Sequence, residues 1–177
     1  MYVFLQMSGF PGSGKSTLAR QISQTTGAVI VDHDISKTAI LRSLSSQGYT
    51  MEGKVIGQLS YDVDWSLVDY YLSNGHSVIM DSPCLYSNLL ETGLELARKH
   101  KKKYKYVECY VEDIELIRNR LKNRERLLSQ IEAPSSEEGF YRALKNSKKP
   151  EEENYIVVDS SKPIAEYLSK VLEYINE

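Results

Sequence analysis

Short apolar runs alternate along the chain with longer stretches of helical periodicity. Runs rich in β-branched and aromatic residues predict five buried strands, at residues 2–7, 28–32, 75–81, 104–111 and 154–159. Between them, apolar residues spaced three and four apart predict helices at residues 15–26, 36–46, 54–73, 89–99, 112–131 and 135–144, and from Ser161 onward. Strands and helices therefore alternate through the whole sequence.

Turn and capping residues mark the ends of several predicted elements. Gly27 follows the first helix, where glycine commonly ends a helix. Ser135 and Glu138 have capping-box spacing, and Pro163 suits the first position of the last helix. These residues agree with the helix boundaries that the apolar pattern predicts.

This order of elements predicts an α/β protein. Strands that alternate with helices form a parallel sheet covered on both faces, with right-handed crossovers and with ligands at the carboxyl ends of the strands. A chain of 177 residues can bury a sizeable core within one domain. We therefore expect residues 1–177 to form a single domain around a five-stranded parallel sheet.

The stretch GFPGSGKST, residues 9–17, joins the first predicted strand to the first predicted helix. It fits the pattern G-x-x-x-x-G-K-[ST], whose glycines let backbone N–H groups surround a phosphate at the start of a helix. Lys15 can reach the β- and γ-phosphates of a nucleoside triphosphate, and the Ser16 hydroxyl can coordinate Mg²⁺. The residues expected to bind the nucleotide here are Gly12, Ser13, Gly14, Lys15, Ser16 and Thr17.

The motifs of two other nucleotide-dependent classes are absent. A GTPase needs DxxG after the third strand and NKxD near the fourth, and neither occurs there. The stretch IMDSPC, residues 79–84, lacks the adjacent acidic pair of many ATP-hydrolysing motors. The sequence therefore favours neither a switch nor a motor.

Two aspartates follow predicted strands and are expected at the carboxyl edge of the sheet, beside the phosphate loop. Asp34 follows the second strand and can act as a general base toward an attacking hydroxyl, with Asp32 as the substitute candidate. Asp81 ends the third strand and can hold a Mg²⁺-bound water or the substrate hydroxyl. An acidic residue at a strand end also commonly caps a helix or turn, and this alternative stays open for Asp34 and Asp81.

Four arginines, at positions 118, 120, 124 and 126, lie within one predicted helix. Arg120 and Arg124 are four residues apart and share one face, so both can reach the same polyphosphate. Planar guanidinium groups suit the charge that spreads over the phosphate oxygens during transfer. An arginine-rich helix alone is more often solvated surface, but beside the other motifs it favours a lid over the phosphates.

Together these features resemble the small P-loop kinases (AAA_33-type ATP-binding kinases) that include the kinase domain of phage polynucleotide kinase, chloramphenicol phosphotransferase and zeta toxin. The resemblance is carried by GFPGSGKST, VDHDISK, GHSVIMDS and RLKNR and covers most of residues 1–172. It implies a three-layer P-loop NTPase fold of the nucleotide-kinase type. It also implies ATP and Mg²⁺ as cofactors and an arginine-bearing lid at about residues 113–150.

By position, the resemblance also implies roles for particular residues. Asp34 is the general base, and Arg124, supported by Arg120, contacts the ATP phosphates. Lys37 lies where polynucleotide kinase has an arginine for the substrate phosphate, and a lysine offers a point charge instead of a bidentate fork. This difference weakens the polynucleotide interpretation. The loop after the fifth strand, with Asp159, Ser160 and Ser161, is placed beside the adenine.

Composition disfavours nucleic acid as the partner. The chain has 22 Lys and Arg against 24 Asp and Glu, a formal charge of −2, without the basic excess of a dedicated nucleic-acid binder. The basic run at residues 98–105 is expected to be a solvated turn on the edge away from the phosphate loop. Cys84 and Cys109 lack metal-ligand spacing, so free thiols and no structural metal are expected. No apolar window approaches a membrane span, and a cytoplasmic location is expected.

The acceptor is expected to lie against residues 35–75, which carry several aromatic side chains. These are Tyr49, Tyr61, Trp65, Tyr70 and Tyr71. They can stack on a base or another ring, but the helical spacing of Tyr61 and Trp65 favours core packing. His33 can tune the neighbouring Asp34, although a position on the polar surface is the favoured interpretation.

Three functions fit these residues. The first is an ATP-dependent kinase that phosphorylates a hydroxyl of a small-molecule or nucleotide-like acceptor, with Asp34 as general base. The second is a polynucleotide 5′-hydroxyl kinase, and the third is a regulatory protein that binds ATP without transferring phosphate. Asp34, Asp81 and the arginines together favour a kinase, because binding alone does not require a base.

The phosphate loop yields a direct prediction. Replacing Lys15 with alanine removes the ammonium group expected on the β- and γ-phosphates, so Lys15→Ala should abolish measurable binding of ATP. Calorimetric titration of the wild type and the variant measures this. An unchanged affinity would contradict the assignment of the loop.

Overall fold

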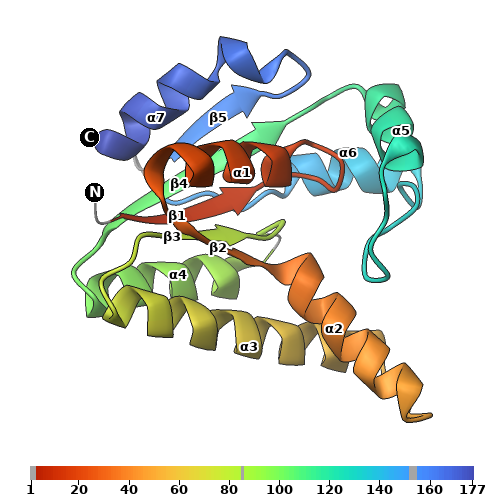
Figure 1. The fold of residues 1–177 in the computed structure, drawn as a ribbon. Coiled ribbons are helices and arrows are strands. Elements are labelled where there is room, and N and C mark those ends of the chain that lie inside the picture. The colour runs from red at the N-terminus through yellow and green to blue at the C-terminus, as the bar shows by residue number, and fades with distance from the viewer. Residues whose placement is uncertain (1–2, 85, 152–154) are drawn as a thin grey trace.

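The computed structural model describes residues 3–84, 86–151 and 155–177, and Figure 1 shows the fold. The strands are β1 (Val3–Ser8), β2 (Val29–Asp32), β3 (Val78–Asp81), β4 (Lys103–Tyr110) and β5 (Tyr155–Asp159). The helices are α1 (Lys15–Thr26), α2 (His33–Ser46), α3 (Gly53–Ser73), α4 (Ser87–Lys99), α5 (Ile114–Asn123), α6 (Glu137–Lys145) and α7 (Leu168–Asn176), with a 3₁₀ turn, η1 (Ile164–Glu166), before α7. Tyr2 and Asn154, predicted to begin the first and fifth strands, lie outside the described residues.

The strands form one sheet in the order β2-β3-β1-β4-β5. Every neighbouring pair is parallel, which confirms the predicted α/β class with a five-stranded parallel sheet. β1 lies in the centre, and the chain leaves it first toward β2 and β3 and later toward β4 and β5. This reversal places the loop after β1 at the position where open parallel sheets bind their ligands.

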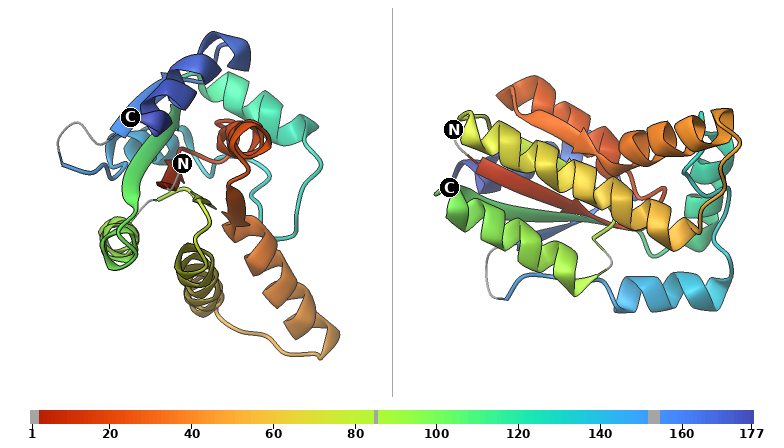
Figure 2. Two further views of the ribbon diagram at one scale, coloured as in Figure 1. Left: turned by 60° about the vertical axis from the view of Figure 1, so that its left-hand side comes forward. Right: turned by 90° about the horizontal axis from the view of Figure 1, so that it is seen from below.

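Helices cover both faces of the sheet (Figure 2). Along β1, Val3, Leu5 and Met7 are buried in a cluster with side chains of α1 and α7. Phe4 is buried in a second cluster with side chains of α3 and α4, which lie next to each other below the sheet. Alternate side chains of the central strand therefore hold the two helical layers.

A buried polar side chain ties β1 to α4. The Nε2 group of Gln6 donates hydrogen bonds to the Leu89 carbonyl (3.2 Å) and to Cys84 Sγ (3.1 Å). Its Oε1 accepts one from the Tyr104 hydroxyl (2.8 Å). Gly93 of α4 lies against this amide, since a Cβ there would stand 2.2 Å from Oε1 of Gln6. The missing side chain at position 93 therefore lets α4 approach the sheet.

Both cysteines are buried and have free thiols, as predicted. Burial raises the pKa of the Cys84 thiol to about 11, so this thiol is protonated at neutral pH. Cys84 is therefore a packed core side chain that also accepts the hydrogen bond from Gln6.

The helix predicted over residues 112–131 is wrong in its second half. α5 ends one residue before Arg124, whose backbone is extended (φ −85°, ψ 149°). The three- and four-residue apolar spacing stops at Leu121, and Leu127 follows only six residues later, so no continuous apolar stripe remains to be buried. Residues 124–131 instead form an irregular loop.

The start of α2 also differs from the prediction. α2 begins at His33, three residues before the predicted start at Ser36. The carboxylate of Asp32 accepts a hydrogen bond from the backbone N–H of Asp34 (2.9 Å) and caps the helix. Asp34 therefore lies in the first turn of a helix and not at the end of a strand.

Two later helix starts are corrected as well. Ser136, not Ser135, caps α6, since its hydroxyl accepts a hydrogen bond from the N–H of Gly139 (2.9 Å). Pro163 precedes only the short 3₁₀ turn, and the last α-helix begins at Leu168. The shift from Ser135 to Ser136 is a single residue, which is within the usual spread of helix boundaries.

The contact between α4 and the sheet can be tested by substitution. Gly93→Ala should lower the free energy of unfolding by about 1–3 kcal/mol, because the added methyl group displaces the buried Gln6 amide. Gly57→Ala is the matched control: position 57 is inside α3, and a Cβ there would have no atom within 4 Å, so alanine should stabilise by up to about 1 kcal/mol. Urea denaturation measures both, and equal changes of the same sign would contradict this packing.

Candidate functional site

The loop between β1 and α1 forms a cradle of backbone groups. Gly9, Gly12 and Gly14 all have positive φ angles, of 139°, 88° and 93°. A Cβ on Gly9 would stand 2.4 Å from the carbonyl oxygen of Cys109, so only glycine fits there. Gly14 caps α1, a twelve-residue helix whose N-terminus favours negative charge. The loop therefore has the backbone shape that a phosphate group requires.

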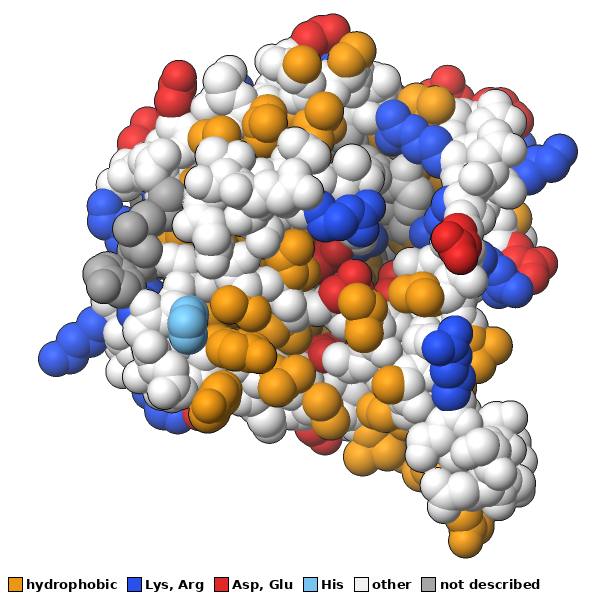
Figure 3. All heavy atoms as spheres, viewed as in Figure 1, with side chains coloured by type: hydrophobic (Ala, Val, Ile, Leu, Met, Phe, Trp, Pro, Cys, Tyr) orange, Lys and Arg blue, Asp and Glu red, His pale blue; other side chains and the backbone are white. Residues whose placement is uncertain are grey.

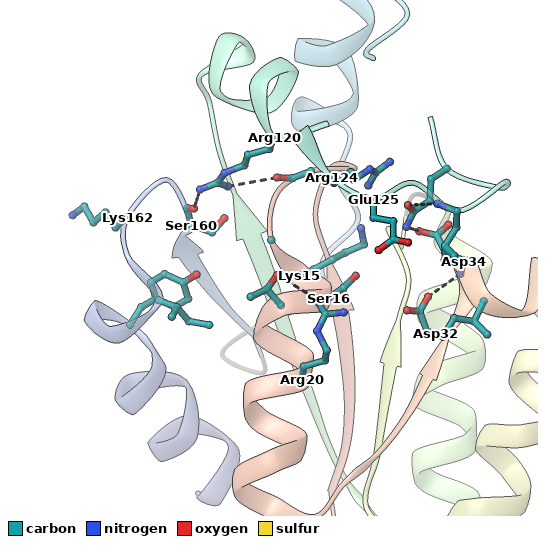
Figure 4. A pocket seen from close by; sticks show the side chains of 18 residues that line it. Lys15, Ser16, Arg20, Asp32, Asp34, Arg120, Arg124, Glu125, Ser160 and Lys162 are labelled. Carbon is teal, nitrogen blue, oxygen red and sulfur yellow. Dashed lines mark hydrogen bonds between the residues drawn. The ribbon is translucent and has the colours of Figure 1, made fainter. Parts of the chain in front are cut away.

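Side chains from the other end of the sequence hold this cradle in place. The hydroxyl of Ser160, after β5, donates a hydrogen bond to the carbonyl of Ser13 (2.6 Å). The guanidinium of Arg120 donates to the carbonyls of Ser160 (2.7 Å) and Gly12 (3.5 Å). Figure 4 shows Arg120 and Ser160 joined in this way beside the loop. Both residues thus support the loop directly.

A cavity of about 650 Å³ opens over the cradle. The predicted site residues that line it are Gly12, Gly14, Lys15, Ser16, Thr17, Asp34, Arg120, Arg124 and Ser160. Ser13 is buried behind the loop, and Lys37 lies in a second cavity. In Figure 3 acidic and basic side chains gather around a hollow near the middle of this face. The structure therefore brings most of the predicted nucleotide site together.

Two carboxylates lie side by side here: Asp32 lines the cavity, and Asp81 is buried next to it. Asp32 and Asp81 are partners in the β2–β3 register at the carboxyl edge of the sheet. Burial raises the pKa of Asp81, and the positive charge of Lys15 opposes this. Burial and the neighbouring Asp81 raise the pKa of Asp32 to about 6. The charge of Lys15 thus acts on the buried Asp81, and Asp32 lies beside it, half-buried.

The Asp81 carboxylate fits an indirect role toward Mg²⁺. Asp81 is 3% exposed, and neither of its side-chain oxygens has a hydrogen-bond partner among the described residues. Across the same residues, no cluster of three or more His, Cys, Asp or Glu side chains could hold a metal ion by itself. Ser16 lines the cavity above it. These oxygens suit Mg²⁺ held mainly by nucleotide phosphates and water, with Ser16 as a direct ligand.

Asp34 is held in position by the loop that follows α5. Nε2 of Gln130 donates a hydrogen bond to Oδ2 of Asp34 (2.8 Å). The hydroxyl of Ser129 donates to the Asp34 carbonyl (3.0 Å) and accepts a bond from the Thr38 hydroxyl (3.0 Å). Sequence patterns did not indicate Gln130 or Ser129, because both lie in the segment predicted to be helical.

Arg120 and Arg124 meet in the cavity, but not for the predicted reason. Arg120 lies on α5, whereas Arg124 follows the helix, so they do not share a helix face. The guanidinium of Arg124 donates to the carbonyl of Ile131 (2.8 Å). Burial lowers the pKa of Arg124, and the charge of Asp34 opposes this. The loop therefore brings a guanidinium group close to Asp34 (Figure 4).

A second cavity, of about 780 Å³, adjoins the first. Three residues, Asp34, Arg124 and Gln130, line both cavities. Tyr61 and Trp65 pack against the core, as favoured, and also line this second cavity. Tyr61 and Trp65 can therefore pack in the core and also present ring surface to a molecule in the second cavity.

His33 does not lie on the polar surface, and that expectation is wrong. It is 6% exposed, and its Nδ1 lies 2.7 Å from Oδ2 of Asp64 on α3. Its ring stacks on Tyr61, with 3.9 Å between ring centroids. The carboxylate of Asp64, 31 residues away in the chain, supplies the buried partner that local sequence does not reveal.

The sheet order, the phosphate loop and the adjoining cavity define an α/β protein with the P-loop fold of the nucleotide kinases, as predicted. The chain belongs to the AAA_33 family, described as an AAA domain, whose model matches residues 5–139. It is 34% identical over 122 residues to an Arabidopsis thaliana protein named calmodulin calcium-dependent NAD kinase. That match covers 61% of this chain and only 23% of the longer relative.

Solved structures share this fold at low sequence identity. A gluconokinase from Sinorhizobium meliloti is 16% identical, with a TM-score of 0.64 and coverage of 99% of this chain and 92% of that one. The APS kinase CysC of Mycobacterium tuberculosis, in complex with AMPPNP and APS, is 14% identical, with a TM-score of 0.62 and coverage of 99% and 98%. Throughout the described ranges, no helix has both the length and the apolar character needed to cross a membrane.

The raised pKa of Asp32 predicts a pH-dependent stability. The carboxyl of Asp32 has a pKa near 3.8 when unperturbed and of about 6 in the fold, so the folded state binds this proton more tightly. The free energy of unfolding should therefore fall as pH rises from about 4 to about 6 and stay lower above that. In Mg²⁺-free protein, Asp32→Asn should stabilise by about 1–3 kcal/mol at pH 7.5 relative to its effect at pH 4.

A control of opposite sign is available on α3. Hydrogen bonds from His100 and Lys99 lower the pKa of Asp69, so Asp69→Asn should lose stability, not gain it, above pH 4. Thermal unfolding across this pH range measures both variants. A pH-independent effect of Asp32→Asn would show that the carboxyl is not perturbed.

Proposed function

We propose that the protein is an ATP-dependent kinase that transfers the γ-phosphate of ATP to a hydroxyl group of a small-molecule or nucleotide-like acceptor. The observation that carries this proposal is the position of Asp34, which lines both adjoining cavities. A base at the junction of a nucleotide site and a second cavity can act on a hydroxyl that approaches the terminal phosphate.

In this proposal, ATP occupies the first cavity. The backbone N–H groups of residues 12–17 and the Lys15 ammonium bind its phosphates, while Ser160 lies on the nucleoside side of the loop. Arg120 and Arg124 face the phosphates from α5 and from the following loop. Mg²⁺, held by Ser16 and through water by Asp81, would neutralise phosphate charge. Excess positive charge over the γ-phosphate stabilises the transition state.

Asp34 takes the proton in the transfer step. The acceptor oxygen forms a bond to the γ-phosphorus, the bond from that phosphorus to the leaving ADP oxygen breaks, and the hydroxyl proton moves to the Asp34 carboxylate. The Gln130 amide orients that carboxylate. Asp32 suits this role less well, because its carboxylate caps α2 and it does not line the second cavity.

The second cavity receives the acceptor in this proposal. Lys37 lines it and has no ion-pair partner among the described residues, so it is available to an anionic group of the acceptor. The names of the relatives refer to NAD, gluconate and APS, which are small molecules. These observations support a small-molecule or nucleotide-like acceptor.

A polynucleotide acceptor is less well supported. The basic run at residues 98–105 spans the end of α4 and the start of β4. Lys103 pairs with Val3 at the amino edge of the sheet, whereas the phosphate loop follows Ser8 at the carboxyl edge. A strand bound along this run would therefore lie far from Asp34.

The lid and the domain organisation also belong to this proposal. We assign the lid to α5, the loop of residues 124–131 and α6, within residues 113–150. The chain 1–177 then acts as one domain in which this segment covers the phosphates. The hydrogen bond from Gln130 to Asp34 connects this lid to the proposed base.

Replacing Asp34 tests the proposal. Asp34→Asn should lower transfer from γ-labelled ATP at least about 100-fold while ATP affinity changes less than about threefold, because only the proton acceptor is lost. The probes are NAD⁺, D-gluconate, a metabolite extract and a 5′-hydroxyl oligonucleotide. Asp62→Asn, which removes another carboxylate from the second cavity, is the matched control and should keep near-normal transfer.

Each outcome has a separate meaning. Undiminished transfer in Asp34→Asn would refute the base, and label on the oligonucleotide would identify a polynucleotide kinase. ATP binding without transfer to any probe would favour the regulatory protein.

A further inference from the structure

A buried histidine–aspartate pair forms part of the second cavity. Nδ1 of His33 lies 2.7 Å from Oδ2 of Asp64, whose side chain is fully buried. Oδ1 of Asp64 has no hydrogen-bond partner among the described residues. His33 itself lines the cavity, immediately before Asp34 in the first turn of α2. Neither His33 nor Asp64 has a role in the transfer step described above.

Packing alone does not account for this pair. Removing a carboxylate from water is costly, and apolar side chains of similar volume would join α2 to α3 at least as well. A second pair, His100 and Asp69, is partly exposed and joins α3 to the end of α4 outside the cavity. Only the His33 pair directs an imidazole toward the space beside the catalytic base.

The geometry fixes what the imidazole presents to the cavity. The proton on Nδ1 is donated to Asp64, and the stacked Tyr61 ring, tilted by 15°, holds the plane of the imidazole. A neutral imidazole held in this way has its lone pair on Nε2. Nε2 makes no hydrogen bond among the described residues and belongs to a ring that lines the cavity. In the neutral form of the ring, Nε2 is therefore an oriented hydrogen-bond acceptor.

We propose that Nε2 of His33 accepts a hydrogen bond from a second hydroxyl of the phosphate acceptor, apart from the hydroxyl that gives its proton to Asp34. Both side chains line the second cavity, so one acceptor bound there can offer a hydroxyl to each. The chemical class of the acceptor is then a polyol, such as the ribose of a nucleotide, a free sugar or a sugar acid. This inference rests on the proposed kinase function.

The rest of the cavity suits a sugar ring or polyol chain. Trp65 and Tyr86 contribute aromatic surface, on which the apolar face of a sugar can pack. Gln58, Asn88 and Thr92 add neutral hydrogen-bonding groups along the wall. Apolar surface combined with a few oriented polar groups is typical of small-molecule sites.

The test uses a variant that removes Nε2 of His33 but keeps a hydrogen-bond donor to Asp64. In His33→Asn the side-chain amide can still donate to Asp64 but has no atom at the position of Nε2. His100→Gln is the matched control, since it changes the other histidine–aspartate pair outside the cavity. The probes are NAD⁺ for the ribose arm and D-gluconate for the sugar-acid arm, with D-ribose and 2-deoxy-D-ribose as a pair that differs in one hydroxyl.

For a probe that accepts phosphate, His33→Asn should raise its KM about tenfold, with kcat within about threefold and the KM for ATP unchanged. The wild type should prefer D-ribose over 2-deoxy-D-ribose, and His33→Asn should lose that preference. His100→Gln should match the wild type. An unchanged acceptor KM in His33→Asn would overturn the inference while leaving the kinase function in place.

A second readout does not depend on transfer. In wild-type protein with ¹⁵N-labelled histidine, a bound polyol should shift the Nε2 resonance of His33 and leave that of His100 unchanged. A shift without any transfer would support the polyol site and count against the kinase function. The absence of a shift with all four probes would overturn the polyol site.

Discussion

Parallel pairing of β2 and β3, which sets Asp32 beside Asp81 at the carboxyl edge of the sheet, is the constraint on which the site depends. Burial raises the pKa of both carboxyls in this low-dielectric place, and the neighbouring Asp81 adds to the effect on Asp32. The positive charge of Lys15 opposes the shift of Asp81. Arg20, Arg120 and Arg124 line the adjoining cavity, so the positive charge of the site is not confined to Lys15.

The architecture was largely predictable because its signals are local. Each strand is a short apolar run, each covering helix has its own periodicity, and the phosphate loop is one contiguous motif ending in Lys15 and Ser16. Because one or two helices follow every strand, few sheet topologies remain. The capping roles of Asp32 and Ser136 were harder to assign, because neighbouring residues of the same chemistry compete for one helix end.

The surroundings of Asp34, the proposed base, were not predictable, because they depend on contacts between distant segments. Gln130 reaches Asp34 across 96 positions of sequence, and its loop was predicted to be a helix. His33 and Asp64 lie on different helices, so neither residue alone suggests a buried pair. Residues whose position depends on tertiary structure, and not on local periodicity, therefore surround the proposed acceptor.

Trp65 gives the protein an intrinsic optical reporter. It is the only tryptophan in the sequence, it lines the second cavity, and its ring packs edge-on against Phe4 of the central strand, with 6.5 Å between ring centroids. The first cavity contains no tryptophan. Indole emission therefore senses the polarity of the second cavity and the integrity of the core beneath it, so that occupancy can be followed without attaching a dye.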